Sequence, residues 1–195
     1  MSSKTTTDNR EKILRAALEL FAARGYAAVG VQEIVKAVGV TKPTLYHYFG
    51  SKRGLLEAMF EEIAAPFFDQ LAGHSAYRGD LTRSLTQIVR LHFDFARAEP
   101  VFYRFQLGLS FAPPKSEEHE VVHPYQKRQQ GMLEKTFKDA VRDHGNLRGH
   151  HQLYAVTLLG MVHQHVLRLL NREQRPGDEL LYKVVKQFMH GMYAL

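Results

Sequence analysis

The stretch from Val31 to Phe49, VQEIVKAVGVTKPTLYHYF, constrains this chain more than any other, because it predicts two short helices joined by a glycine turn. Apolar residues in its first half recur at the i, i+3, i+4, i+7 spacing of a helix with one buried face. They are Val31, Ile34, Val35 and Val38. Gly39 follows where a helix must end and the backbone needs a positive φ, which glycine adopts at little cost. We therefore expect a sharp turn at residue 39.

A second short helix is predicted immediately after this turn. Thr41 offers a side-chain oxygen that can cap the helix, and Pro43 is tolerated in its first turn. Leu45 and Phe49 lie four residues apart and share the face that can pack on the first helix. The opposite face then presents donors, a cation and an aromatic ring, from Lys42, Thr44, Tyr46 and His47.

A helix with such a face is typical of proteins that read DNA in the major groove. Its N-terminal side chains contact base edges, while hydroxyls and lysines hold phosphates. Tyr48 borders the buried face, so packing and DNA contact are equally open for it. Ser51 caps the next helix, which places Lys52 beside the end of the reading helix. The predicted DNA-contacting residues are Gln32, Thr41, Lys42, Pro43, Thr44, Tyr46, His47, Tyr48 and Lys52.

The run GVTKPTLYHYFGSKRGLLEAMF resembles the N-terminal signature of tetracycline-repressor-type (TetR family) regulators. Their usual segment reads Ala-Gly-Val-Ser-Lys-Gly-Thr-Leu-Tyr-His-Tyr-Phe, followed by Lys-Glu-Glu-Leu-Leu. The resemblance covers about Arg10 to Phe60 without gaps and is more specific than a general helix-turn-helix pattern. Pro43 replaces a frequent glycine at a position that faces DNA in the family, which leaves the base preference open. The resemblance implies a ligand-responsive transcription regulator, more often a repressor.

The distribution of charge agrees with a DNA-binding N-terminus. Through residue 53 the chain has nine basic and four acidic residues, so most of its net charge of +6 lies in the first quarter. Such asymmetry suits a phosphate-binding head on a nearly neutral body. The chain has no cysteine, which excludes disulfides and thiolate metal sites. No apolar signal segment or run of ~18 apolar residues is evident, so we expect a cytoplasmic protein.

Helical periodicity continues through the chain and no strand pattern appears, so the predicted fold class is all-α. We expect an N-terminal three-helix helix-turn-helix domain over residues 1–50 and a helical effector-binding and dimerisation domain over residues 51–195. The first helix is expected to start at Asp8 or Asn9, after a mobile tail. The fourth should run from Ser51 to Phe67 and bend or end at Pro66. Asp80 is expected to cap a further helix.

Aromatic residues concentrate between Phe67 and Phe111, where nine fall in 45 residues. From the residues alone, an aromatic core without a cavity and an apolar pocket with a few polar groups remain equally open. The resemblance favours a pocket, because TetR-type bodies bind a small effector, here expected to be mostly apolar or aromatic. The predicted lining is Phe67, Phe68, His92, Phe93, Phe95, Phe102, Tyr103, Phe105 and Tyr125.

The last two predicted helices carry more apolar residues than one core face can use. Burial on both sides, as in a two-fold helix-bundle dimer, explains this excess. The predicted interface residues are Leu158, Val162, Val166, Leu169, Leu181, Val184, Val185 and Phe188. A dimer presents two reading helices about one DNA turn (~34–36 Å) apart, and so predicts a palindromic operator. Effector binding that shifts the helix from Ser51 to Phe67 would change this spacing.

A zinc hydrolase and a helical protein-interaction adaptor are the two alternatives to a DNA-binding function. His119, Glu120 and His123 fit the H-E-x-x-H spacing of zinc hydrolases, but Pro124 biases His123 away from helical geometry. A helical protein-interaction adaptor would leave the basic head and its turn unexplained. We therefore predict no catalytic residues, no metal site and no cofactor, with a DNA operator, a second copy of the chain and a small effector as partners.

Overall fold

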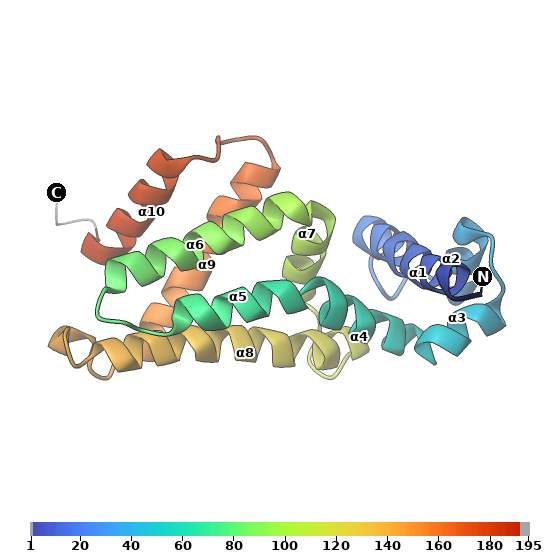
Figure 1. Cartoon of the computed structure of the whole chain (residues 1–195), viewed down its shortest axis with the longest axis horizontal. Helices are drawn as coiled ribbons and strands as arrows, with labels where there is room; N and C mark the ends of the chain where they lie inside the picture. Colours follow the sequence, from blue (N-terminus) through green and yellow to red (C-terminus); the bar gives the residue numbers. More distant parts are fainter. Residues whose placement is uncertain (1, 192–195) are drawn as a thin grey trace. The chain divides into compact units, whose positions relative to one another are not determined.

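The computed structural model describes the backbone of residues 2–191 and the side chains of residues 9–191 (Figure 1). Over this range the chain forms helices and no strand, so the predicted all-α class is confirmed. The helices are α1 (Ser2–Arg24), α2 (Val31–Val38), α3 (Lys42–Phe49), α4 (Lys52–Ile63), α5 (Ala65–Ser75), α6 (Leu81–Ala98), α7 (Pro100–Leu109), α8 (Glu117–Ala140), α9 (His151–Leu170) and α10 (Asp178–His190), with a short 3₁₀ helix η1 (Gly145–Leu147).

The chain divides into two compact units. Unit 1 comprises the chain through Ala65 together with Val101–Pro124, and unit 2 comprises Pro66–Pro100 together with the chain from Tyr125 onward. The predicted domain boundary after residue 50, which separates the helix-turn-helix from the rest of the chain, stays a prediction. In the structure, α4 and α7 belong to the same compact unit as the helix-turn-helix, because their side chains complete its core.

The core of unit 1 is built from apolar faces of α1, α2, α3, α4 and α7. Ile13 and Phe21 of α1 are almost fully buried. The ring of Phe21 stacks on Phe105 of α7 with centroids 6.1 Å apart. Phe60 of α4 meets Phe102 of α7 edge to face at 5.1 Å. These aromatic contacts explain why α7, which follows the head by fifty residues, belongs to the same compact unit.

Two predicted helix boundaries differ from the structure. The first helix begins at Ser2 instead of Asp8 or Asn9. A polar residue that can cap a helix does not have to mark its start when the residues before it can also be helical. The predicted fourth helix ends at Ile63, and Phe67 lies on the separate helix α5. Pro66 falls in the first turn of α5, where its missing N–H has no intrahelical partner to lose.

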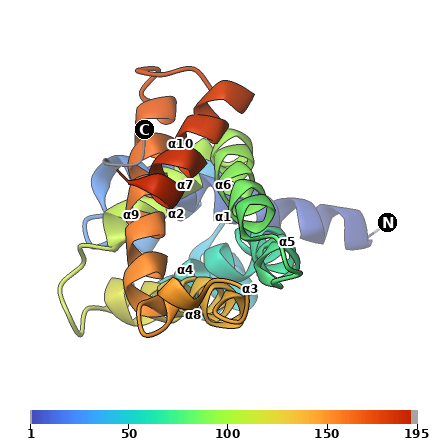
Figure 2. The ribbon, with the colours of Figure 1, turned by 90° about the vertical axis from the view of Figure 1, so that its left-hand side faces the viewer.

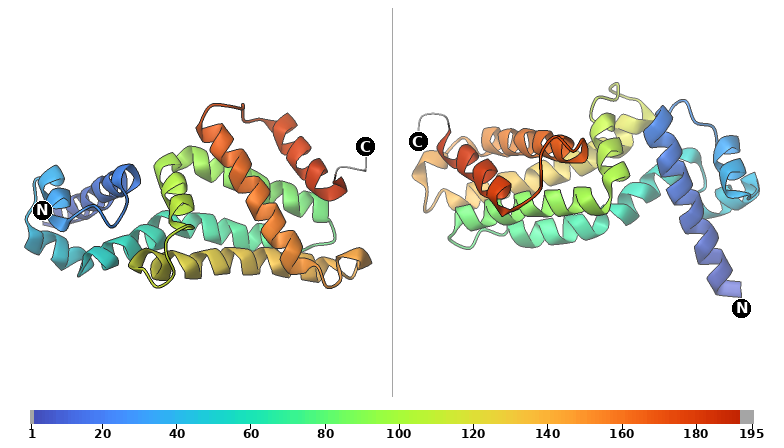
Figure 3. Two further views of the ribbon diagram at one scale, coloured as in Figure 1. Left: turned by 180° about the vertical axis from the view of Figure 1, so that it is seen from behind. Right: turned by 90° about the horizontal axis from the view of Figure 1, so that it is seen from above.

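Unit 2 is a bundle in which α9 and α10 both pack on α6 (Figure 2). Seen from behind, α9 crosses α6 (Figure 3). The helix α6 starts as predicted, because an Asp80 carboxylate oxygen accepts the N–H of Arg83 at 2.8 Å. The hydroxyl of Thr136 on α8 donates to the carbonyl of Ser75 at the end of α5, at 2.8 Å, and joins these two helices. Leu85, Ile88 and Leu158 are fully buried between the helices.

The helix α8 continues through Pro124, so the predicted bias of His123 away from helical geometry is wrong. Proline removes one backbone hydrogen bond and disfavours helix in the preceding residue. Val121 and Val122, just before this position, are 4% and 2% exposed. Burial of these two side chains offsets the local cost and keeps the helix intact.

Candidate nucleic-acid interface and the helical body

The turn between α2 and α3 has the geometry that its glycine predicts. Gly39 has φ 75° and ψ 30°, in the left-handed region. The N–H of Val40 donates to the carbonyl of Val35 at 3.0 Å and closes the end of α2. A side chain at position 39 would strain this backbone, so a glycine is required where α3 changes direction.

The buried faces of α2 and α3 are the predicted ones. Ile34, Val35, Leu45 and Phe49 are all buried. The guanidinium of Arg10 lies over the ring of Phe49, 5.1 Å from its centroid. Contacts on this side fix the rotation of α3 about its axis, and thereby fix which of its side chains face outward.

The outward face of α3 presents polar and aromatic groups to solvent. Lys42, Pro43 and His47 are exposed, and Tyr46 is 45% exposed. Thr44 and Tyr48 are half-buried at the edges of this face, and Gln32 and Thr41 are exposed nearby. The structure therefore brings eight of the nine predicted DNA-contacting residues to one helix-turn-helix surface. Whether they contact DNA stays a prediction.

The N-terminus of α3 is capped differently from the prediction. Thr41 is the N-cap residue, but its side chain makes no hydrogen bond to the backbone of the helix. Its hydroxyl instead pairs with the hydroxyl of Thr44, at 2.9 Å. Two hydroxyls that bond one another leave the first backbone N–H groups of α3 without a capping side chain. Backbone N–H groups at a helix N-terminus suit a phosphate oxygen.

Ion pairing leaves free cations on the helix-turn-helix. Arg10 makes a double hydrogen bond to the carboxylate of Glu62, and Arg24 pairs with Glu33. A hydrogen bond from the backbone N–H of Gly30 and this arginine lower the pKa of Glu33. Within the described residues, neither Lys36 of α2 nor Lys42 of α3 has an acidic partner. These lysines are the charges of the turn that are available to phosphates.

Lys52, the ninth predicted residue, is held differently. Its ammonium lies 4.0 Å from the centroid of the Tyr26 ring and 5.8 Å from that of Phe21. Burial lowers the pKa of this amine. A lysine that is stacked on aromatic rings must leave them to reach a phosphate, which costs part of a cation–π contact. Its phosphate contact stays a prediction, with less structural support than that of Lys42.

The junction of α3 and α4 depends on a glycine that the sequence patterns did not single out. A Cβ atom on Gly54 would lie 2.0 Å from the carbonyl oxygen of Phe49. The N–H of Gly54 donates to the capping hydroxyl of Ser51 at 2.9 Å. Close approach of α4 to the end of α3 is therefore possible only without a side chain here. Periodicity cannot reveal this, because the contact is between backbones.

A polar network also joins the head to the first turn of α8. The hydroxyl of Tyr26 donates to Glu117 at 2.7 Å, and burial raises the pKa of this hydroxyl. Arg53 of α4 bridges Glu57 at 2.9 Å and Glu120 at 2.6 Å. The contacts to Glu117 and Glu120 connect residues more than sixty positions apart, so sequence spacing gave no signal for them.

The predicted effector residues separate into two groups. In unit 2, the Phe67 ring lies 4.9 Å from both His92 and Phe95, and Phe68 contacts Phe67 and Tyr125 at 5.5 and 6.1 Å. In unit 1, Phe102, Tyr103 and Phe105 are buried with the head. Phe93 lies on another side of α6, where it borders a small pocket with Leu181 of α10. The structure thus brings together five of the nine predicted lining residues.

His92 is the polar centre of the aromatic cluster in unit 2. Its imidazole is fully buried, its Nε2 lies 3.2 Å from the side-chain nitrogen of Gln129, and its ring lies 5.7 Å from that of His163. Burial, and then the nearby His163, hold the pKa of His92 well below its usual value, and burial lowers the pKa of His163 to about 4. Both rings are therefore neutral at pH 7.

These lowered pKa values predict a loss of stability in mild acid. The unfolded chain binds protons near pH 6.5 while the folded one resists them, so stability is complete above about pH 6.5 and falls below it. Each such imidazole contributes up to about 1.4 kcal/mol per pH unit. We expect His92→Gln to flatten the dependence of unfolding free energy on pH between 6.5 and 5, measured by urea titration. The exposed His190→Gln is the control, and an equal slope in both variants would contradict the assignment.

Six of the eight predicted dimer-interface residues are buried within one chain, and the interface itself stays a prediction. Leu158, Val162, Val166, Leu181, Val184 and Val185 are at most 4% exposed within one chain. Leu169 and Phe188 are half-buried, and Phe188 contacts Phe137 and Tyr154 of its own chain at 5.8 and 6.3 Å. The predicted residues face the core because α6 packs on the side of α9 and α10 that carries them.

The apolar side of α9 that remains open is a different one. Leu153 and Val156 are 62% and 53% exposed, and Gly160 lies on the same face. By length and composition α9 is apolar enough to cross a membrane, with a mean hydropathy of 1.2, and only 22% of its most apolar window is buried. Exposed apolar side chains gathered on one helix face are typical of an interaction surface.

The two histidines of the H-E-x-x-H string share one face of α8, where the rings of His119 and His123 are stacked 4.8 Å apart. Its Glu120 is paired with Arg53, which is unsuited to a general base. Within residues 9–191 no group of three or more histidine, aspartate or glutamate side chains is arranged to hold a metal ion. The string has no third ligand of these types in the part of the chain that the structure describes.

A basic helix-turn-helix joined to a helical body is typical of DNA-binding transcription regulators. Residues 13–59 match the sequence model of bacterial regulatory proteins of the tetR family. The N-terminal segment of this chain therefore resembles the DNA-binding segment of the TetR family. The relatives that align over most of the chain are named transcriptional regulators.

Two relatives resemble the chain over most of its length. The chain is 26% identical over 189 residues, 95% of each chain, to the HTH-type transcriptional regulator YvdT of Bacillus subtilis. It is 28% identical over 172 residues to the transcriptional activator FasR of Mycolicibacterium smegmatis, covering 88% of this chain and 76% of FasR.

Solved structures share the fold along the whole chain. The fatty acid degradation regulator FadR of Bacillus halodurans superimposes with a TM-score of 0.78 at 20% identity, over 96% of this chain and 97% of that one. FadR of Bacillus subtilis, solved in complex with stearoyl-CoA, gives 0.76 at 20% identity, over 94% and 99%.

Proposed function

We propose that this protein binds a palindromic DNA operator as a homodimer in the cytoplasm and represses transcription until a small apolar effector releases it. The observation that carries the proposal is the outer face of α3. Exposed Lys42, Tyr46 and His47 lie there together, and Lys42 has no acidic partner in the described chain. Such donors and free cations match phosphates and base edges in a major groove.

Within this surface we assign different roles to different groups. Lys42 and the tyrosine hydroxyl of Tyr46 hold phosphates, and so contribute affinity that depends on salt. Thr44 and His47 contact base edges and contribute sequence preference. Pro43, which lacks an N–H, shapes the start of the helix. Lys52 is left outside the proposed core of the contact because its ammonium stacks on Tyr26.

The exposed side of α9 is the surface we propose for dimerisation. Leu153, Val156 and Gly160 lie at i, i+3 and i+7, so they form one stripe along the helix. A second copy of the chain covers such a stripe through two-fold symmetry, in which the same patch is used twice. The glycine lets two helices approach closely. This replaces the interface residues expected from sequence.

The effector proposal rests on the aromatic cluster around Phe67 and His92 in unit 2. Aromatic walls with one or two buried polar groups suit a mostly apolar ligand. The structure of Bacillus subtilis FadR contains stearoyl-CoA, which makes a long-chain acyl thioester the first compound to test. Effector binding shifts the population toward a dimer whose two heads no longer fit successive major grooves.

The experiment that tests DNA recognition is a selection of bound fragments from random duplex DNA at low salt, followed by gel retardation. We expect an inverted repeat whose half-sites lie about one helical turn (~10 bp) apart. Binding should weaken steeply with added salt. A purified sample that retards no duplex, including DNA flanking its own coding region, would show that the proposal is wrong.

The effector is tested on that same protein–DNA complex. We expect stearoyl-CoA at micromolar concentration to lower the affinity of the protein for its operator at least tenfold. The reason is that the effector binds the DNA-free conformation better than the DNA-bound one. Free coenzyme A and a short-chain thioester are controls for the acyl chain. Release by all three equally, or by none of a broad set of apolar compounds, would count against an apolar effector while leaving DNA binding in place.

A further inference from the structure

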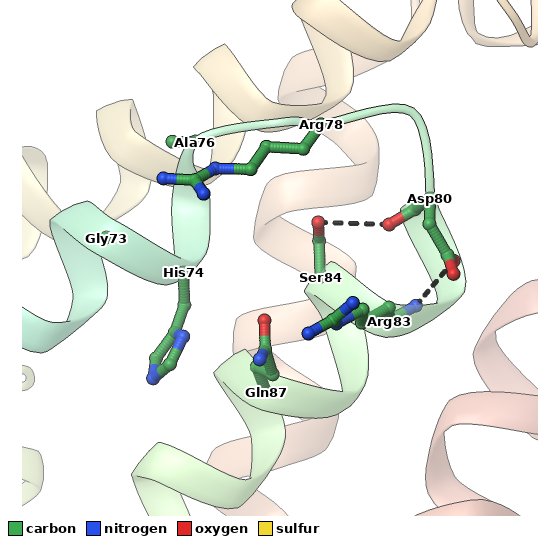
Figure 4. A pocket seen from close by; sticks show the side chains of 8 residues that line it. All are labelled: Gly73, His74, Ala76, Arg78, Asp80, Arg83, Ser84 and Gln87. Carbon is green, nitrogen blue, oxygen red and sulfur yellow. Dashed lines mark hydrogen bonds between the residues drawn. The ribbon is translucent and has the colours of Figure 1, made fainter.

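A polar pocket of about 320 Å³ lies between the end of α5, the following loop and the start of α6 (Figure 4). It is distinct from the aromatic cluster of unit 2. The residues that define it are Gly73, His74, Ala76, Arg78, Asp80, Arg83, Ser84 and Gln87. Its volume is at the lower end of the range for small-molecule sites.

Two guanidinium groups and an imidazole belong to this one pocket. Figure 4 shows Arg78 reaching from the loop, Arg83 and Gln87 from the first turns of α6, and His74 from the end of α5. Their side chains supply hydrogen-bond donors from three separate segments. The only carboxylate in the lining belongs to Asp80.

That carboxylate is already engaged. One oxygen of Asp80 accepts the backbone N–H of Arg83 at 2.8 Å, and its main-chain carbonyl accepts the hydroxyl of Ser84 at 3.1 Å. In Figure 4 the Asp80 carboxylate points away from the guanidinium of Arg83. Asp80 therefore caps α6 and does not neutralise the arginine side chains.

The arginines of the pocket differ in their pairing from the other two arginines of α6. Arg90 on the same helix pairs with Asp178 at 2.7 Å, and Arg97 pairs with Asp94 at 2.6 Å. In the described part of the chain, Arg78 and Arg83 make no such pair. Two cations gathered in a concave site without counter-charges repel each other, and an anion placed between them removes that repulsion.

We propose that this pocket binds a phosphorylated small molecule through its phosphate oxygens. Guanidinium groups match phosphate geometry with paired N–H donors, and Arg83 and Arg78 would take opposite sides of the anion. The side-chain amide of Gln87 and an N–H of His74 complete the set of donors. The polar lining excludes the apolar effector proposed for the aromatic cluster, so the two sites are separate.

The test is calorimetric titration of the full-length protein with inorganic pyrophosphate and, separately, with ADP. We expect both to bind with a dissociation constant below about 1 mM in low salt. The double variant Arg78→Gln/Arg83→Gln should bind at least tenfold more weakly, and Arg78→Lys/Arg83→Lys should recover part of the loss, because it keeps charge without the fork. Arg97→Gln is the matched control and should bind like the unaltered protein.

The two probes also distinguish the source of the phosphate. Tighter binding of ADP than of pyrophosphate indicates a nucleotide, and the reverse indicates a free or otherwise esterified diphosphate. Equal binding by the double variant and the unaltered protein would place the anion elsewhere, such as on the basic head, and would overturn the proposal. Absence of binding by either probe up to about 10 mM, roughly ten times the expected dissociation constant, would also overturn the proposal. Thermal melts of all variants confirm that they fold.

Discussion

Replacing Lys42 and Tyr46 together with alanine is expected to abolish operator binding at physiological salt. Each side chain lies on the exposed face of α3, and Tyr46 is 45% exposed. Losing one such contact costs about 1 to 3 kcal/mol, and a dimer loses every contact twice. The combined loss exceeds roughly 4 kcal/mol, or about a thousandfold in affinity. Gel retardation or fluorescence anisotropy on the selected operator measures this.

The salt dependence of operator binding shows how much of the affinity lost in this variant comes from charge. Loss of a phosphate-bound lysine from each of two subunits lowers the slope of log affinity against log salt by about two. Lys138→Ala removes an exposed lysine from α8 and serves as a control that should leave the slope unchanged. If the double variant bound as tightly as the control, the outer face of α3 would not be the DNA-reading surface.

Placing a glutamate at Val156 is expected to convert the dimer into a monomer. Val156 is 53% exposed in one chain, and covering it with a second copy would bury the introduced charge twice. Burying an unpaired charge costs several kcal/mol, so the dissociation constant of the dimer should rise at least a hundredfold. Light scattering at micromolar concentration gives the mass directly.

The affinity for the operator should fall when the dimer dissociates, because each helix-turn-helix then binds its half-site independently of the other. Val156→Thr preserves the shape of the side chain without adding a charge and should remain dimeric. As a second contrast, Val162→Glu introduces a charge into the core of one chain, so it should lower the melting temperature instead. A folded Val156→Glu protein that stays dimeric would show that this face of α9 is not the interface.

The sequence located the helix-turn-helix well because its signals are local. Spacing of Ile34, Val35, Leu45 and Phe49 gave the buried faces of α2 and α3, and Gly39 gave the turn between them. Asp80 likewise predicted the start of α6. In each case the residues that decide the structure lie within a few positions of one another, so chain geometry alone carries the information.

Local signals failed where two apolar sides competed for one neighbour. On α9, both Leu158 and Val156 belong to apolar stripes, and periodicity gives their angle about the helix axis but not what lies opposite. Packing of α6 on α9 buries Leu158 completely and leaves Val156 exposed. The same limitation affected Phe93, whose ring faces α10 although its neighbours in sequence join the aromatic cluster.

What the sequence by itself determined was the all-helical class, the helix-turn-helix and the outward face of α3, because each follows from hydrogen bonding and burial within a few helical turns. Only the tertiary structure decided which arginines of the described residues lack a carboxylate partner, as Arg78 and Arg83 do, and which rings the ammonium of Lys52 contacts. Those outcomes depend on charges and rings brought together from distant segments. The physical reason is that pairing and coverage are properties of neighbours in space, which spacing along the chain does not specify.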